Sequence, residues 1–122
     1  MEIGLGKRRA TITMIIVKIT MNALPEKRKE VLQTLLSMIE AIRLEKGCSN
    51  YQIFQCIEDE NVFCLIEEWE TREDLEHHMR SDRFGVLMGT KILLNDHPDI
   101  QIHTVSNSEG KGIVNAIRRK GV

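Results

Sequence analysis

The stretch SNYQIFQCIEDENVFCLIEEW, residues 49–69, contains two runs that are typical of β-strands. The runs cover 49–57 and 62–69, and a polar segment, Glu58-Asp59-Glu60-Asn61, joins them. Because this segment has the length that hairpin loops use, the two strands are predicted to pair antiparallel. Side chains alternate along a strand, so Glu67 and Trp69 are predicted to point to the same face.

A strand and a helix are predicted before this hairpin. Residues 11–21 carry β-branched and apolar side chains on both faces, so we expect a strand that is covered on both sides. Pro25 suits the first turn of a helix, where its missing N–H costs nothing, so the helix should begin near Leu24 or Pro25. Lys46-Gly47 supplies a cation and a left-handed cap for its end. One apolar stripe packs this helix on the sheet: Leu32, Leu35, Leu36, Ile39 and Ile42.

Two short helices and a last strand are predicted after the hairpin. Thr71 and Asp74 form a near capping box, and the helix that follows places Leu75, His78 and Met79 on one face. A second helix begins at Ser81 or Asp82 and ends before Pro98, because the residue before proline resists helical geometry. Its inward side chains are Phe84, Leu87, Met88 and Leu94. Residues 99–105 form the final strand.

The predicted order is β-α-β-β-α-(α)-β, which defines an α+β, ferredoxin-like antiparallel sheet with helices on one face. The other face is left bare, and an apolar bare face needs a partner, so we expect a homodimer through the open sheet face. The domain is assigned to residues 11–105, with an N-terminal extension at 1–10 and a C-terminal tail at 106–122. Both end segments carry basic clusters without a strong period and are interpreted as flexible, solvated tails.

The bulk composition excludes several classes of function. The chain has 122 residues and a net charge of -1, which fits one domain and gives no overall field for nucleic acid or an anionic membrane. Its apolar runs are too short for a membrane span, and the N-terminus does not resemble a signal peptide. Three cysteines, Cys48, Cys56 and Cys64, match neither a zinc pattern nor a disulfide framework, so reduced thiols in the cytoplasm are expected. A turn centred on Glu60 would set Cys56 opposite Cys64.

Several short blocks together resemble the antibiotic biosynthesis monooxygenase family across about residues 12–105. They are Glu45-Lys46-Gly47-Cys48-Ser49-Asn50-Tyr51, Phe63 with Glu67-Glu68-Trp69-Glu70, Asp74-Leu75-Glu76-His77-His78, and Ser81-Asp82-Arg83-Phe84. The resemblance implies that two protomers set their sheets face to face in a dimeric α/β barrel. Many relatives have a second histidine where this chain has Arg83, and any mechanism that relies on that histidine is in doubt.

The resemblance also implies a chemistry. The better-known enzymes of this family oxidise polyketide or quinol substrates with dioxygen and without metal or flavin, in a cavity between sheet and helices. By this resemblance, a small aromatic or quinone-like ligand is expected and no cofactor or metal. The implied catalytic residues are His78 and Glu67 as proton acceptors and Trp69 as an orienting donor. The implied substrate-binding residues are Tyr51, Leu65, Met79 and Phe84.

Each candidate has a structural alternative. Trp69 is interpreted as a packing anchor or a donor to a bound ring, and Glu67 as the partner of a helix arginine or as a general base with a raised pKa. His78 is a proton acceptor or a helix residue whose side chain is capped by a carboxylate or by water. The corresponding functions are a cofactor-independent monooxygenase, a non-catalytic, stress-responsive dimer that binds a small molecule, and an isomerase of a small sugar-like metabolite.

Overall fold

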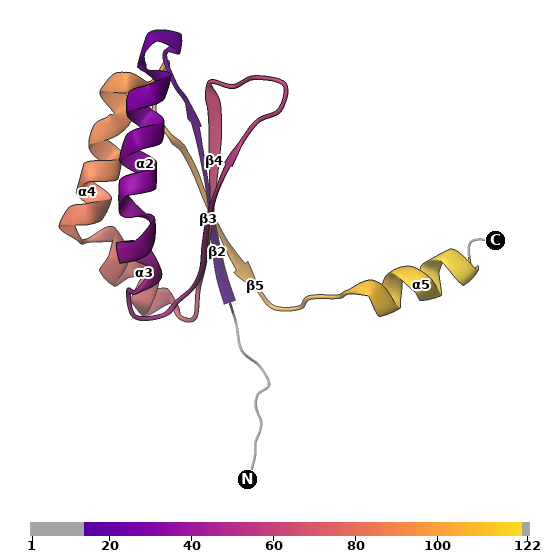
Figure 1. The fold of residues 1–122 in the computed structure, drawn as a ribbon. Coiled ribbons are helices and arrows are strands. Elements are labelled where there is room, and N and C mark those ends of the chain that lie inside the picture. Colours follow the sequence, from indigo (N-terminus) through magenta and orange to yellow (C-terminus); the bar gives the residue numbers. More distant parts are fainter. Residues whose placement is uncertain (1–13, 121–122) are drawn as a thin grey trace.

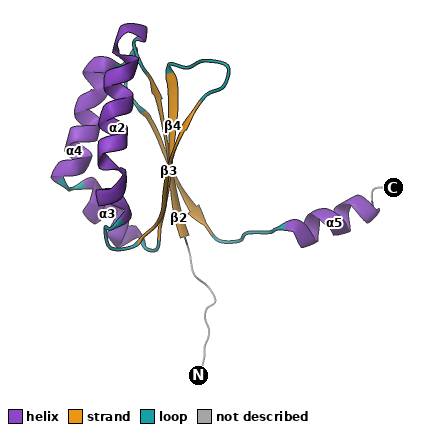
Figure 2. Cartoon of the chain, in the orientation of Figure 1, coloured by secondary structure: helices purple, strands orange, loops and turns teal. Residues whose placement is uncertain are grey.

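The computed structural model describes residues 14–120. Four antiparallel strands form one sheet in the order β3-β4-β2-β5, and the helices α2, α3 and α4 cover one of its faces (Figures 1 and 2). The predicted ferredoxin-like arrangement is confirmed. The extension at 1–10 and the first residues of the predicted 11–21 strand lie outside the described part of the chain.

The element bounds follow the sequence signals closely. The strands are β2 (Met14–Asn22), β3 (Cys48–Gln55), β4 (Val62–Trp69) and β5 (Asp99–Val105), and the helices are α2 (Arg28–Arg43), α3 (Arg72–Met79), α4 (Asp82–Gly89) and α5 (Lys111–Lys120). Short 3₁₀ turns, η1 (Pro25–Lys27) and η2 (Thr90–Leu93), precede α2 and follow α4. Thr71 and Ser81 cap α3 and α4, because their hydroxyls accept from the backbone N–H of Asp74 and Phe84.

The core lies between the sheet and the helical layer. Its strand side chains alternate with exposed ones, and the buried positions include Val17, Ile19, Phe63 and Leu65. In α2 the stripe differs from the prediction: Val31, Leu35, Met38 and Ile42 are buried, Leu32 and Ile39 pack against the core, and Leu36 is exposed. The helix therefore presents a face rotated away from Leu36.

The second face of the sheet is open and is less apolar than predicted. Ile16, Ile66 and Phe54 lie on it, but so do Lys18 and Gln52, since these residues alternate with buried ones and share rows in the strand register. The expectation that β2 is covered on both sides is wrong for the single chain, in which Lys18 is exposed. A partner on this face would meet an apolar centre with polar neighbours.

The hairpin register does not set Cys56 opposite Cys64, as a turn centred on Glu60 would have done. Cys64 pairs with Phe54, and the backbone N–H of Cys56 donates to the carbonyl of Val62. The turn is thus centred on Asp59 rather than Glu60. All three cysteines are free.

The segment after β5 contains a helix where a tail without regular structure was expected. Five residues, 106–110, connect β5 to α5, which projects away from the domain (Figure 1). No helix among residues 14–120 is long and apolar enough to cross a membrane.

Gly47 holds the turn between α2 and β3, and we predict that Gly47→Ala lowers the free energy of unfolding by at least ~1 kcal/mol. Its φ is +83°, in the left-handed region, and an added Cβ would overlap the side chain of Asp74. Urea unfolding measures the effect. The matched control is Gly85→Ala in α4, where nothing lies within 4 Å of an added Cβ and helix propensity should add about 0.5–1 kcal/mol. If Gly47→Ala and Gly85→Ala changed the free energy of unfolding equally, Gly47 would not be required in this turn.

Candidate functional site

Glu67 is a carboxylate placed inside the protein core. It lies on β4 between Val17 of β2 and Tyr51 of β3, on the face that the helices cover, and its side chain is fully buried. Its Oε1 accepts a hydrogen bond of 2.9 Å from Nε1 of Trp69, two residues along the same strand face. An arginine partner was the structural alternative, and among the described residues Glu67 has none. The imidazole of His78 lies near it instead, with Nε2 at 3.8 Å from Oε1 of Glu67.

His78 is buried as well and is fixed by aromatic rings. Its exposed fraction is 1%. The Trp69 ring stacks on the imidazole with centroids 4.6 Å apart, and the Phe84 ring meets it edge-on at 5.4 Å. Leu75 and Ser81 frame this position, because α3 turns its apolar face inward and Ser81 Oγ donates to the carbonyl of His78. His78 is therefore an interior residue.

Glu45, which the sequence interpretation did not place in the site, binds His78 from the other side. Its Oε1 lies 2.8 Å from Nδ1 of His78, and its Oε2 accepts from Nη1 of Arg83 at 2.7 Å. An ionised carboxylate only accepts hydrogen bonds, so the Nδ1 atom of His78 carries a proton. In the neutral ring, Nε2 is then an acceptor that faces Glu67.

Three buried polar atoms at this place have no hydrogen-bond partner among the described residues: Oη of Tyr51, Oε2 of Glu67 and Nε2 of His78. Tyr51 and Glu67 are directly opposite in the strand register, and Nε2 of His78 is 3.8 Å from Oε1 of Glu67. A buried polar group without a partner costs about 1–3 kcal/mol. Such a cluster is a candidate for binding the hydroxyl or carbonyl groups of a ligand.

The titration behaviour follows from this burial. Burial raises the pKa of Glu67, and nearby Glu45 raises it further, while the hydrogen bond from Trp69 and the charge on His78 act in the opposite direction. Burial and the neighbouring Glu67 also raise the pKa of the Tyr51 phenol. Tyr51 is therefore a neutral O–H donor at physiological pH, and Glu67 is a carboxyl group poised to hold a proton.

The expected apolar pocket is largely filled by side chains. Of the five best-formed hollows among residues 14–120, none is lined by Glu67, Trp69 or His78. The nearest approach is a hollow of about 210 Å³ in which Tyr51 lines the wall together with Arg43, Cys48, Ser49 and Asn50. Because Tyr51 is itself fully buried, this hollow lies beside the buried cluster without exposing it.

The other predicted ligand-binding residues divide into two groups. Phe84 reaches the cluster through its contact with His78. Leu65 is buried on the same face of β4 as Glu67 but one row away, beside Ile53 and Ile19, and Met79 packs against the core from the end of α3. No group of three or more His, Cys, Asp or Glu side chains within residues 14–120 could hold a metal ion.

Comparisons with known proteins give a consistent picture. Residues 14–88 match the family model described as "Antibiotic biosynthesis monooxygenase". A Bacillus subtilis protein named "Putative monooxygenase YcnE" is 30% identical over 88 residues, which cover 71% of this chain and 93% of that protein. A conserved protein from Methanosarcina mazei has a crystal structure that is 28% identical with a TM-score of 0.69, covering 76% of this chain and 92% of that one. The structure of Rv0793 from Mycobacterium tuberculosis shares the fold, with a TM-score of 0.73, 19% identity and coverages of 80% and 99%.

The buried carboxyl gives a prediction about pH. Its pKa in the folded protein lies above the unfolded value of 4.5, so folding loses stability as the pH rises above that value and a charge must be buried. Glu67→Gln keeps the acceptor for Trp69 but carries no charge. We expect the variant to gain stability relative to the wild type between pH 4 and pH 7, by about 1.4 kcal/mol for each unit of the upward shift.

Urea unfolding at several pH values checks this. Glu70→Gln, which changes an exposed carboxylate just after β4, is the control and should show the same difference from the wild type at both ends of the range. A constant difference between Glu67→Gln and the wild type from pH 4 to pH 7 would contradict the burial of a titrating group.

Proposed function

This chain belongs to the antibiotic biosynthesis monooxygenase family, and we propose that it oxidises a small quinol-like or polyphenolic substrate with dioxygen and without a cofactor. The observation that carries the proposal is the cluster of unpartnered buried atoms on Tyr51, Glu67 and His78. It offers one neutral donor and two acceptors, which is the set that a phenolic or quinol substrate needs for binding and for loss of a proton.

The proposed chemistry begins with a proton transfer. The substrate hydroxyl gives its proton to Nε2 of His78 or to Oε2 of Glu67, and the electron-rich ring that results reacts with dioxygen. One oxygen atom stays in the product and the other leaves as water, so a hydroquinone and dioxygen give a hydroxyquinone and water. The substrate supplies all the electrons. Tyr51 Oη donates a hydrogen bond to the developing oxyanion.

Glu45 and Arg83 act on His78 in this proposal without touching the substrate. The hydrogen bond from Nδ1 of His78 to Glu45 keeps Nε2 free as the acceptor, and Arg83 holds the Glu45 carboxylate in place. The side chain of Glu45 is 14% exposed, and that of Arg83 is 38% exposed. The side chains of Glu67, His78 and Glu45 therefore form a proton relay that leads from the interior to water. The abstracted proton can leave the site along this relay.

The substrate is placed next to Tyr51, with entry from the hollow that Arg43 and Asn50 line. That hollow is small, at about 210 Å³, so a rotation of Tyr51 or Trp69 must accompany binding. Trp69 then serves as a mobile wall as well as the donor to Glu67. The same cluster without any reaction is the arrangement of a small-molecule-binding protein, the second candidate function.

We also propose that the protein is a cytoplasmic homodimer joined through the open sheet face. Proteins of this family are typically dimeric. The open face carries the apolar side chains of Ile16, Ile66 and Phe54, which water would otherwise meet. Three free thiols fit a reducing compartment.

The reaction is tested by oxygen uptake with a panel of naphthoquinols and anthrones. We expect turnover by the wild type and a loss of about 10²-fold or more in kcat for His78→Ala, because a general base contributes 10²–10⁴-fold. His77→Ala, on the exposed side of the same helix, is the control and should retain full activity.

A wild-type protein that consumes no dioxygen above background, with His78→Ala unchanged, would exclude the monooxygenase. Tight binding of the same compounds without oxygen uptake would then favour the binding protein.

The dimer is tested by sedimentation at micromolar concentration. We expect a dimer for the wild type and a folded monomer for Ile66→Glu, because this change places a charge at the centre of the open face. The control is Ile92→Glu, which alters an exposed side chain in η2 on the helical side. A wild-type monomer would contradict the proposed assembly.

A further inference from the structure

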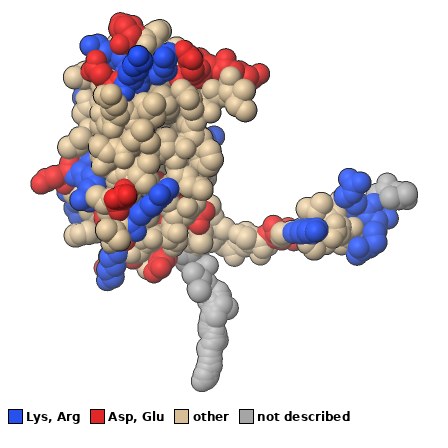
Figure 3. Space-filling view, viewed as in Figure 1, with Lys and Arg blue, Asp and Glu red and all other residues tan. Residues whose placement is uncertain are grey.

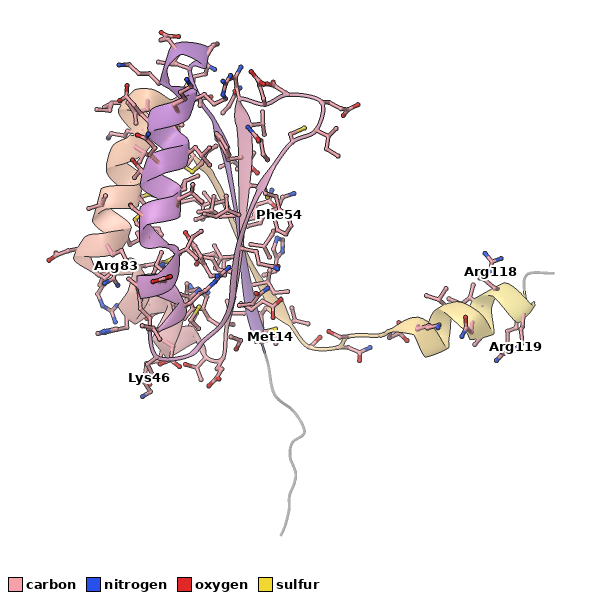
Figure 4. All side chains as sticks on the ribbon, in the orientation of Figure 1. Met14, Lys46, Phe54, Arg83, Arg118 and Arg119 are labelled. Carbon is pink, nitrogen blue, oxygen red and sulfur yellow. The ribbon has the colours of Figure 1, made fainter. Side chains whose placement is uncertain are left out.

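The helix α5 has one apolar side that nothing in its own chain covers. Ile113, Val114 and Ile117 lie on that side and are 39%, 51% and 61% exposed. Arg118, Arg119 and Lys120 make the end of the helix basic. Figure 4 shows Arg118 and Arg119 far from the sheet, and among the described residues no backbone hydrogen bond joins α5 to the sheet or to another helix. A lone apolar helix face of this kind marks a contact surface.

The tip of the β3–β4 hairpin carries the complementary chemistry. We define the hairpin patch as Phe54 and Ile57, which are both exposed, together with the acidic residues Glu58, Asp59 and Glu60. Phe54 points to the open side of the sheet in Figure 4, and acidic residues gather at the hairpin tip in Figure 3, while basic residues gather at the end of α5. Apolar and acidic groups on the patch thus match apolar and basic groups on α5.

The hairpin patch of the same chain is at the limit of the reach of α5. Val105 pairs with Met14 and Val62 pairs with Asn22, so the end of β5 and the hairpin lie at opposite ends of β2, about 26 Å apart. The connection from Val105 to Lys111 spans at most about 20 Å, and the helix from there to Ile117 adds about 9 Å. Docking within the chain would therefore need a fully extended connection with the helix in line with it, whereas α5 projects away from its own domain (Figure 1).

We propose that α5 docks on the hairpin patch of a second copy of this chain. The proposal builds on the dimer through the open sheet face: if the two sheets face each other with opposed strand directions, the hairpin of each protomer comes to the β5 end of the other. Two identical contacts then close the pair, one at each end, as two-fold symmetry requires. Figure 1 shows α5 on the open side of the sheet, where the second copy would sit.

A native thiol makes the contact measurable. Cys56 is free and exposed between Phe54 and Ile57. In the full-length chain, Ile117→Cys puts a second thiol on the apolar side of α5, and mild oxidation should give a disulfide-linked dimer on a non-reducing gel. Adding Cys56→Ser should abolish that band. Asn115→Cys, on the opposite side of the helix, is the matched control and should cross-link at least about tenfold more slowly.

Sedimentation of the same samples separates the two proposals. A dimer without the Cys56-dependent link means that the sheet contact stands and the docking of α5 is wrong, and a monomer overturns both. A disulfide that leaves the protein at monomer mass also overturns the docking. Binding of α5 to vesicles of anionic phospholipid, without the link, would instead identify a membrane-surface helix.

A double variant tests how much the apolar side of α5 contributes to the stability of the dimer. Ile113→Ser with Ile117→Ser alters only exposed side chains, so the domain should fold normally. We expect the dissociation constant of the dimer to rise at least about tenfold. An unchanged constant would overturn the proposal.

Discussion

The burial of the Glu67 carboxylate is the constraint from which the arrangement of the site follows. A carboxyl group on the covered face of a sheet must be neutral or be met by donors. The indole N–H of Trp69 meets one oxygen, and no other donor of the described chain completes the set. The protonation state of Glu67 therefore depends on any group that binds beside it. A residue needed only for packing would not have this property.

The second constraint is the connection between α2 and β3. Gly47 takes a left-handed conformation, its carbonyl accepts from Glu70, and the turn presents Glu45 to α3. Because Arg83 on α4 binds the same carboxylate, one short turn joins the sheet, two helices and the imidazole of His78. Arg83 thus serves to hold Glu45.

Local signals predicted most of the fold, and non-local contacts account for what they missed. The caps at Thr71 and Ser81 and the alternation in β4 are set within a few residues, so they can be recognised in the sequence. The contact of Glu45 with His78 joins residues 33 positions apart, and no spacing rule points to it. The hint available was that Glu45 directly precedes the glycine turn. The helical spacing of Ile113, Val114 and Ile117 could also be seen in the sequence. The segment is short and ends in basic residues, however, so it was interpreted as a solvated tail.

The composition of the open face explains why a second contact between protomers is useful. Lys18 and Gln52 flank Ile66 in its register row, so an interface there must satisfy polar groups as well as bury apolar ones. Such an interface fixes how the two sheets align, but it gains less binding free energy from the same buried area than a fully apolar interface would. In the proposed dimer, a helix on a five-residue connection that binds the partner's hairpin would act at a high effective concentration once the sheets have met, and it would strengthen the pair without changing the sheet surface. The proposed sheet contact and the proposed docking of α5 would therefore act together on a sheet face that is only partly apolar.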